Sequence, residues 1–282
     1  MKNILFLTDF SENSWNALKY GISFFAERNC SFYILHVNNN ILDFQKDNIL
    51  PLSKQNDIEK LYTRPTKKRL KEILKRISRE LFHNKNHKFF TLTNYGFFVE
   101  SVRKHVLEKK IDLIIMGAQG ASVLKEYIVG SNTGDVITKV KCSTLIIPKN
   151  ATYSGLKEIA FPTDFAISYE ISVLQPILDI LKNNNSSLRI LHIGQKEEQL
   201  NTDQKTHKDL ISDFFYGFNY TYHYLTNTKV EKGIQCFVES RNTNLIAMVA
   251  KNLNYFQQIL FHSKTEHISY HTNIPFLVLH EE

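Results

Sequence analysis

The sequence predicts an α/β fold made of two tandem doubly wound domains, and three observations lead to this prediction. Short apolar runs alternate with segments whose apolar residues recur at helical spacing, as in parallel strands joined by helices. Apolar blocks recur in the same order in the two halves of the chain. The 282 residues, 43% hydrophobic and 22% charged, give a globular composition and enough chain for two domains.

The internal repeat consists of four matched blocks. They are separated by 155 or 156 residues early in the chain and by 132 residues later: 2–10 with 157–165, 34–37 with 190–193, 113–116 with 245–248, and 145–147 with 277–279. The first half therefore has about 24 more residues between its second and third strands. We interpret the pattern as a tandem duplication with domains at 1–150 and 151–282.

The expected elements of the first half follow from the spacing of apolar residues. Residues 3–8 and 32–37 are short apolar runs, as in buried parallel strands. Residues 12–28 between them, and residues 66–83 after them, carry the apolar stripe of an amphipathic helix. The remaining elements are a strand at 88–93, a helix at 97–109, a strand at 112–116, a helix at about 131–141 and a strand at 143–147. Ligands of such sheets bind at the carboxyl ends of the strands.

A glycine-containing segment, residues 116–133 (MGAQGASVLKEYIVGSNT), follows the fourth of these strands. Glycine permits positive φ and lets a ligand approach the main chain closely. Gly130 precedes Ser131, Asn132 and Thr133 at a helix start, where free N–H groups and the helix dipole favour an anion. The segment predicts a phosphate-binding site. The alternative is that the glycines are turn residues and the polar residues an N-cap.

The spacing G-x2-G-x9-G-S, from Gly117 through Gly120 and Gly130 to Ser131, resembles the nucleotide-binding motif of the universal stress proteins. The segment 8–11 (TDFS) at the end of the first strand resembles that family too, although Leu7 stands where the family often has proline. Because both halves share the pattern, the chain resembles a tandem-domain universal stress protein. The resemblance implies Rossmann-like domains of the adenine nucleotide alpha hydrolase type, each with a five-stranded parallel sheet. It also implies that the last strands of the two domains pair as a pseudo-dimer.

The resemblance further implies an ATP site in the first domain, which would bring magnesium where the nucleotide carries it. Asp9 would lie beside the adenosine, and the main chain of Val37 would contact the adenine edge. Met116 and Gly117 would lie along the ribose. The phosphates would be met by the loop and the helix start, at Gly120, Gly130, Ser131, Asn132 and Thr133.

The second half departs from the motif. At the separation of 132, Val249, Asn252 and His262 replace the three glycines, and only Ser263 matches. A β-branched valine disfavours positive φ, and a histidine side chain would intrude on phosphates. Asp164 alone is weak evidence for a site. We expect a degenerate second domain without nucleotide; the alternative is a different ligand in its cleft.

The formal net charge of +7 is unevenly distributed. Residues 1–150 carry 24 basic and 14 acidic side chains, a net +10, whereas residues 151–282 carry a net −3. A basic first half suits a phosphate ligand. The basic segment 64–79 is either a nucleic-acid surface or the solvated face of an amphipathic helix. Its Leu and Ile stripe favours the helix, so we expect no nucleic-acid partner.

Other classes of site and location are not indicated. No apolar run is long enough for a membrane span, and Asp9 and Glu12 interrupt the apolar N-terminus, so a cytoplasmic protein is expected. The three cysteines form no CxxC pair. His267 and His271 are four apart on a predicted helix, but the chain has 11 histidines and we attribute the spacing to chance. No P-loop, GxSxG or HExxH motif is present, so we expect no catalytic residues.

The leading hypothesis is a cytoplasmic stress-response protein that binds ATP in its N-terminal domain and acts as a sensor or regulator. Its protein partner is unknown, and the pseudo-dimer can pair further into a homodimer. One alternative is a nucleotide-free interaction scaffold. Another is a weak ATP hydrolase, for which Asp9 is the one carboxylate expected near the triphosphate.

Overall fold

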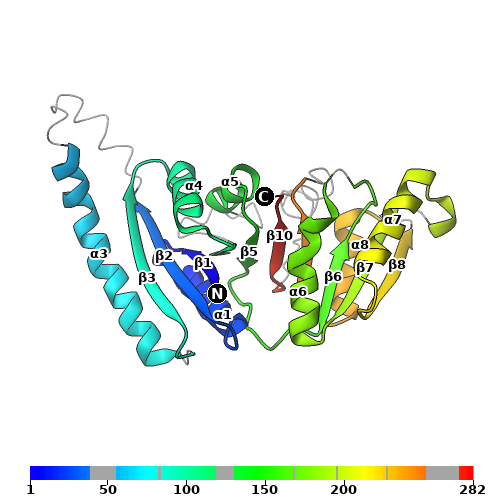
Figure 1. Ribbon diagram of the computed structural model, residues 1–282, viewed down its shortest axis with the longest axis horizontal. Helices are drawn as coiled ribbons and strands as arrows, with labels where there is room; N and C mark the ends of the chain where they lie inside the picture. Colours follow the sequence, from blue (N-terminus) through cyan, green and yellow to red (C-terminus); the bar gives the residue numbers. More distant parts are fainter. Residues whose placement is uncertain are drawn as a thin grey trace.

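The computed structural model describes residues 1–38, 55–81, 84–118, 130–167, 169–194, 196–226, 228–251 and 273–281. Their strands form a 10-stranded sheet in the order β3-β2-β1-β4-β5-β10-β9-β6-β7-β8, with helices on both faces (Figure 1). Neighbouring strands are parallel except at the centre, where β5 and β10 pair antiparallel. The predicted pair of Rossmann-like doubly wound sheets, joined through their last strands, is therefore confirmed.

The elements of the first half lie within a few residues of the expected ones, with one exception. They are β1 (Lys2–Leu7), α1 (Glu12–Phe24), β2 (Cys30–Asn38), α3 (Gln55–Glu80), β3 (Lys88–Tyr95), α4 (Phe98–Lys109), β4 (Leu113–Gly117), α5 (Ser131–Lys139) and β5 (Thr144–Ile147). The exception is α3, which begins eleven residues earlier than predicted and continues through Pro65. A proline inside a helix removes one backbone hydrogen bond, and α3 tolerates that loss while its later turns bury Leu70 and Ile77.

The second half repeats this order. Its elements are β6 (Glu158–Pro162), η2 (Ile171–Leu174), α6 (Gln175–Asn184), β7 (Ser187–Gly194), η3 (Glu197–Gln199), α7 (Thr202–Phe214), β8 (Tyr220–Thr226), α8 (Val230–Ser240), β9 (Leu245–Val249) and β10 (Phe276–Leu279). The strand register repeats as well: Ile4 pairs with Leu113, and their counterparts Ile159 and Leu245 pair in the same way.

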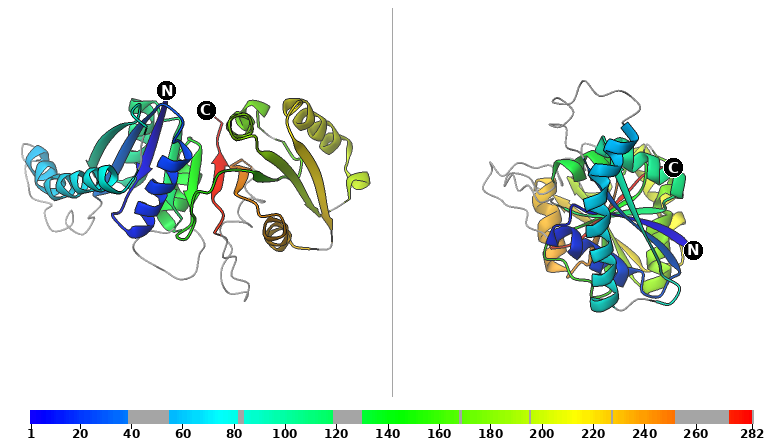
Figure 2. Two further views of the ribbon diagram at one scale, coloured as in Figure 1. Left: turned by 90° about the horizontal axis from the view of Figure 1, so that it is seen from below. Right: turned by 90° about the vertical axis from the view of Figure 1, so that its left-hand side faces the viewer.

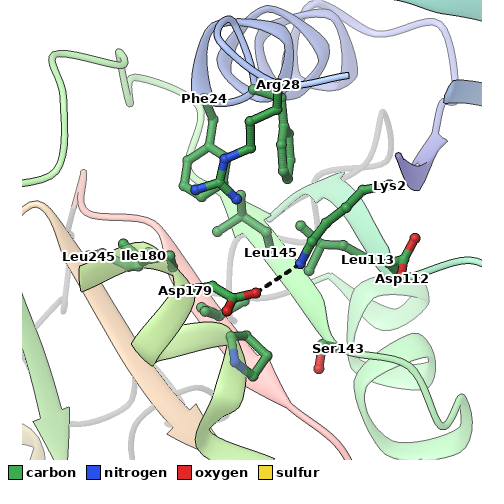
Figure 3. A pocket seen from close by; sticks show the side chains of 13 residues that line it. Lys2, Phe24, Arg28, Asp112, Leu113, Ser143, Leu145, Asp179, Ile180 and Leu245 are labelled. Carbon is green, nitrogen blue, oxygen red and sulfur yellow. Dashed lines mark hydrogen bonds and ion pairs between the residues drawn. The ribbon is translucent and has the colours of Figure 1, made fainter. Parts of the chain in front are cut away.

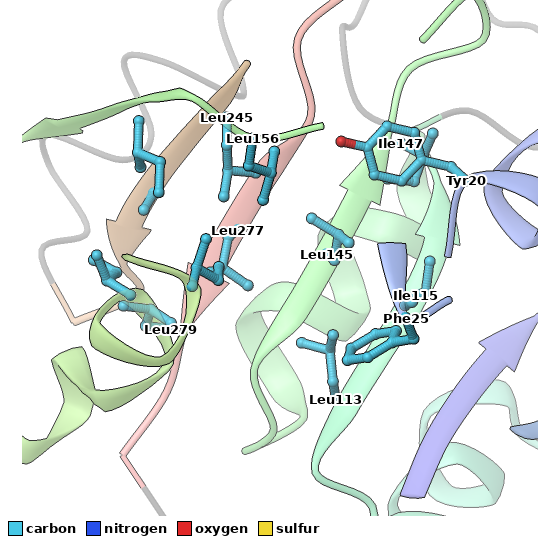
Figure 4. Close-up of a cluster of buried hydrophobic side chains, with 14 of the residues drawn as sticks. Tyr20, Phe25, Leu113, Ile115, Leu145, Ile147, Leu156, Leu245, Leu277 and Leu279 are labelled. Carbon is cyan, nitrogen blue, oxygen red and sulfur yellow. The ribbon is translucent and has the colours of Figure 1, made fainter. Parts of the chain in front are cut away.

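A pseudo-twofold axis passes between β5 and β10. Leu145 pairs with Leu277, its own counterpart in the repeat, and Figure 4 shows the two side chains on these adjacent strands. Because β5 and β10 are antiparallel, the carboxyl ends of the first-half strands lie at the edge where the second-half strands begin. The carboxyl ends of the strands, where ligands of such sheets bind, therefore lie at opposite edges of the sheet in the two halves.

The hydrophobic core differs between the two faces of the sheet. On the face covered by α1, α3, α6 and α7, one apolar cluster extends across both halves and includes Ala151 and Leu156 of the linker between β5 and β6. On the other face there are two clusters: one lies under α4 and α5, and the other lies under α8 and also includes Ile137 of α5 and Ile146 of β5. Figure 2 shows the helices on either side of the sheet. Among the helices described, none combines the length and apolar character needed to span a bilayer.

Candidate functional site

The carboxyl ends of β1, β2 and β4 lie side by side at one edge of the sheet, because β1 stands between β2 and β4. This is the point where the strand order reverses, and α1 and α5 both begin near it. The fold brings Asp9, Val37, Met116 and Gly117 to this edge, together with the start of α5. Gly120 lies outside the described residues.

A tight turn follows β1 and fixes the carboxylate of Asp9. Phe10 adopts a φ of 65°, and its N–H donates to Oγ1 of Thr8 at 3.0 Å. The Asp9 Oδ1 atom accepts from the N–H of Ser11 at 3.0 Å and from the Ser11 hydroxyl at 2.6 Å. The Ser11 Oγ atom in turn accepts from the N–H of Ser14 and caps α1. The turn thus ties Asp9 to the first turn of α1.

His36 and Arg69 support this turn, although neither is a predicted site residue. The Nδ1 atom of His36 lies 2.7 Å from the carbonyl oxygen of Thr8, and its ring centroid is 4.5 Å from that of Phe10. Burial lowers the pKa of His36, so the ring is neutral at pH 7 and donates from Nδ1. The guanidinium of Arg69, on α3, lies 3.9 Å from the centroid of the Phe10 ring. The recurrence of a histidine at equivalent strand ends, His36 and His192, was the available signal.

Gly117, the last residue of β4, is required for close packing. A Cβ atom on Gly117 would lie 2.9 Å from Nδ2 of Asn13 at the start of α1. Its φ lies outside the left-handed region, and Gly130 has φ −67° and ψ 159°, so neither glycine is needed for a positive φ. The physical reason for Gly117 is therefore space. Gly130 N–H also donates to the carbonyl of Ala118 at 2.8 Å, which holds the two ends of the loop together.

The amino end of α5 faces the same edge without a side-chain cap. Gly130 is the N-cap residue, and Ser131 and Asn132 are exposed. Thr133 is buried, and its hydroxyl donates to the carbonyl of Gly117 at 3.0 Å. The Thr133 hydroxyl thus joins α5 to β4. The first N–H groups of a helix have no acceptor within the helix, so this end attracts anions.

At the carboxyl ends of β2 and β4, backbone groups face the edge formed by β1, β2 and β4. The Met116 side chain is buried in the core, so only its backbone is available there. Beyond Val37, the side chain of Asn38 accepts from Oγ1 of Thr66 at 2.7 Å and donates to the carbonyl of Asn94 at 3.1 Å. These bonds fix the strand end between α3 and β3.

The turn after β6 repeats the backbone of the turn after β1. Phe165 has a φ of 59°, its N–H donates to Oγ1 of Thr163 at 3.0 Å, and Nδ1 of His192 lies 3.0 Å from the Thr163 carbonyl. The Oδ1 atom of Asp164 accepts from the N–H of Ala166 at 2.9 Å. Ala166 has no hydroxyl, so the second contact that Ser11 makes in the first half is lost.

The surroundings of this second turn are closed by side chains. Phe165 is fully buried, and α7 covers the turn: Gln204 donates to the carbonyl of Asp164 at 2.9 Å, and Nδ1 of His207 lies 2.7 Å from the carbonyl of Phe165. The repeat places Tyr169 where the first half has Asn13, and buried Val249 where it has Gly117. Burial, followed by the nearby Asp164 carboxylate, raises the pKa of the Tyr169 phenol. Asn252, His262 and Ser263 lie outside the described residues.

Metal ligands were not expected in this chain. In the part of the chain that the structure describes, no three His, Cys, Asp or Glu side chains come together as a metal site. His267 and His271 lie outside that part. The three cysteines are free thiols; Cys30 and Cys142 are buried and Cys236 is exposed.

Comparisons with known proteins agree with the fold. Residues 1–148 match the Universal stress protein family. Universal stress protein MJ0577 of Methanocaldococcus jannaschii is 28% identical over 159 residues, which cover 52% of this chain and 95% of that protein. A universal stress protein structure from Archaeoglobus fulgidus superposes with a TM-score of 0.69 at 19% identity, covering 98% of this chain and 97% of that one. A putative universal stress protein from Pseudomonas aeruginosa covers 99% of this chain and 93% of its own, with a TM-score of 0.58 at 11% identity. The last two likenesses concern the fold alone.

Proposed function

Because the chain belongs to the universal stress protein family, we propose that its first domain, residues 1–150, binds ATP at the edge formed by β1, β2 and β4. One observation carries the proposal. The Asp9 turn, the close approach at Gly117 and the uncapped start of α5 meet at this edge. In the second domain, residues 151–282, α7 covers the equivalent turn, and the buried Val249 stands where the first domain has Gly117.

The chemistry of the edge suits each part of the nucleotide. The N–H groups at the start of α5, with the exposed side chains of Ser131 and Asn132, are donors for phosphate oxygens. The Asp9 carboxylate is an acceptor for the ribose hydroxyls, and the main chain of Val37 offers polar groups for the adenine edge. Magnesium, where the nucleotide carries it, would be held mainly by the phosphates. The net charge of +10 on residues 1–150 favours a polyanionic ligand.

We assign the site a regulatory role rather than a catalytic one. Hydrolysis needs a group that orients the attacking water at the terminal phosphate, and the proposed binding mode places the Asp9 carboxylate beside the ribose instead. Binding would instead alter the surface at this edge of a stress-response protein that works in the cytoplasm with a protein partner. If the protein is instead a weak ATP hydrolase, it should release phosphate from ATP. Asp9→Asn should then abolish this release and leave the ATP affinity unchanged.

Calorimetric titration with ATP and magnesium tests the proposal. We expect one ATP per chain for the wild type. Gly130→Val keeps an allowed backbone, because φ is −67° there, yet it crowds the start of α5 and should abolish binding. No heat with the wild type, together with a melting temperature unchanged by millimolar ATP, would favour a nucleotide-free scaffold instead. Two sites per chain would contradict a degenerate second domain.

A further inference from the structure

Phe10, the residue after Asp9, has a backbone conformation that a phenylalanine seldom adopts. Its φ of 65° lies in the left-handed region, where the Cβ atom is crowded against the backbone. Such a conformation persists only where the surrounding structure holds it. Because Phe10 is bonded directly to Asp9, the contacts that hold Phe10 also set the direction of the Asp9 carboxylate.

The Phe10 ring is contacted from two neighbouring elements. On β2, the ring centroid of His36 lies 4.5 Å from that of Phe10, and Nδ1 of His36 lies 2.7 Å from the carbonyl oxygen of Thr8. On α3, the guanidinium of Arg69 lies 3.9 Å from the Phe10 centroid. At this distance a cation is attracted by the ring. The contacts from β2 and α3 therefore hold the ring, and through it the turn.

The second half holds the equivalent residue without a cation. Phe165 has a φ of 59° and is fully buried, and Gln204 on α7 donates to the carbonyl of Asp164 at 2.9 Å. Phe10 is only half-buried, and α3 meets it with the exposed Arg69. The arginine thus takes the place that burial and a hydrogen bond have in the second half.

A second arginine fixes α3 beside this segment. Arg76 follows Arg69 by two helical turns, about 10 Å along the axis. Its guanidinium lies 4.1 Å from the ring centroid of Trp15 and donates to Glu12 at 3.0 Å. Arg69 forms no ion pair with any carboxylate that the structure describes. Of these two arginines on aromatic rings, Arg69 is the one that contacts the turn after β1.

We propose that Arg69 is a positioning residue for ATP: by stacking on Phe10, it holds the Asp9 carboxylate in the direction that meets the nucleotide. The inference rests on the proposed function, because it concerns the same edge of the sheet. Arg69 acts through Phe10 and Asp9 and needs no contact of its own with ATP. Without it the turn samples other conformations, and the apparent ATP affinity falls with the fraction that remains competent.

Calorimetric titration of the full chain with ATP and magnesium tests the inference. Arg69→Met removes the charge from an exposed side chain and should weaken ATP binding about fivefold. Arg69→Lys should lose no more than about twofold, because an ammonium also interacts with the ring. In an Asp9→Ala chain, Arg69→Met should cause no further loss, because Arg69 acts through Asp9. A guanidinium that merely attracted the phosphates would weaken binding in both backgrounds.

The chain offers two matched controls, each an arginine on an aromatic ring. Arg76→Met removes the other contact of this kind on α3, and Arg28→Met removes one at 5.7 Å from the Phe25 centroid. Arg28 lies at the opposite edge of the sheet, where it lines a pocket of about 50 Å³ together with the ion pair of Lys2 and Asp179 (Figure 3). Both variants should bind ATP as the wild type does.

A second readout, the pKa of His36, needs no nucleotide. Burial lowers this pKa, the hydrogen bond to the Thr8 carbonyl raises it, the Arg69 cation lowers it and the Asp9 carboxylate raises it. Titration followed by nuclear magnetic resonance should therefore give a higher pKa for His36 in Arg69→Met than in the wild type. The pKa should not change in Arg76→Met. An unchanged pKa in Arg69→Met would contradict a contact between Arg69 and the turn.

Three results of the titrations would overturn the inference alone. The first is equal ATP affinity in the wild type and Arg69→Met. The second is equal weakening by Arg69→Met and Arg76→Met, because a loosened α3 would then be the cause. The third is a further loss when Arg69→Met is added to Asp9→Ala, because Arg69 would then act on ATP directly. No ATP binding by the wild type would instead overturn the proposed function and this inference together.

Discussion

The turn after β1 and the turn after β6 share a backbone but differ in their surroundings. Both place a phenylalanine at positive φ, at 65° and 59°, and both have a histidine that contacts the preceding threonine carbonyl. Beside the first turn, Asn13 lies against Gly117, whereas the second turn is covered by α7 and buried with Phe165. The comparison teaches that the fold itself requires the Thr-Asp-Phe turn. An aspartate in this turn is therefore only weak evidence for a ligand by itself, and the residues beside the turn decide.

The largest expected effect comes from exchanging the residue that sets this space. Gly117→Val introduces a Cβ at 2.9 Å from Asn13 and should weaken ATP binding at least 100-fold, or by about 2.7 kcal/mol. The matched variant Val249→Gly should not create a second ATP site, because Gln204 and His207 still close the turn. It should cost about 1–3 kcal/mol of unfolding free energy, because a buried side chain is removed. Calorimetry and urea denaturation measure both effects, and wild-type ATP affinity in Gly117→Val would show that space at β4 is not limiting.

The next largest effect is a pH dependence of the free energy of unfolding that arises in the second half and has no equivalent at the matching position of the first half. Burial lowers the pKa of His280, at the end of β10, to about 4, whereas its counterpart at the end of β5 is Pro148, which cannot titrate. An unfolded histidine titrates near 6.5, so the unfolded chain binds the proton first as the pH falls. The contribution of the neutral His280 ring to the free energy of unfolding is complete above pH 6.5, and it is lost as the pH falls toward 4. We expect a loss of about 2 kcal/mol, less than the shift alone would give, because His280 is not fully buried.

Urea denaturation between pH 7 and pH 4 measures this loss. His36, His105, His192 and His223 also have lowered pKa values, so part of the slope remains in any single variant. The informative quantity is the difference between His280→Gln and the wild type. Identical slopes for the two proteins would exclude His280 as a source of acid sensitivity.

A smaller effect separates the two aspartates. Asp9→Ala removes the acceptor of two hydrogen bonds and should weaken ATP binding roughly tenfold, whereas Asp164→Ala should leave ATP binding unchanged. Each variant should lose about 1 kcal/mol of unfolding free energy, because each turn loses a hydrogen-bond acceptor. Equal ATP affinities for the two variants would mean that Asp9 serves the turn alone.

The sequence predicted the alternation and the duplication, because apolar periodicity reports directly on burial. The central strand pair was implied by the resemblance to the universal stress proteins and not by the periodicity. The sequence also predicted the helix start at Ser131, because a glycine before polar residues marks an N-terminus. Positive φ, one of the two reasons it gave for Gly117, is wrong, and a one-dimensional pattern cannot show that Asn13 lies against this glycine. The sequence placed the start of α3 after Pro65, although tertiary packing carries the helix through that residue. It could not show that Arg69 packs on the Phe10 ring, because the two residues lie in distant segments of the chain.

The smallest effect concerns how each half holds its edge helix. In the first half, Arg76 on α3 bonds Glu12 at 3.0 Å and lies 4.1 Å from the centroid of the Trp15 ring. In the second half, the Tyr222 hydroxyl donates to the Lys208 carbonyl of α7 at 3.0 Å. Tyr222→Phe should cost about 1 kcal/mol of unfolding free energy, and Arg76→Lys about 0.5 kcal/mol.

Removing the Glu12 carboxylate should lower the free energy of unfolding less than removing the Arg76 guanidinium. Its side chain is 76% exposed, and exposed ion pairs contribute little. Glu12→Gln should therefore change the urea midpoint less than Arg76→Lys, and added salt should not remove the effect of Arg76→Lys, because stacking on Trp15 is not an ion pair. If Glu12→Gln changed the urea midpoint more than Arg76→Lys, and added salt removed the effect of Arg76→Lys, the ion pair would be what holds α3. The two edge helices would then differ in the physics of their attachment as well as in the residues that provide it.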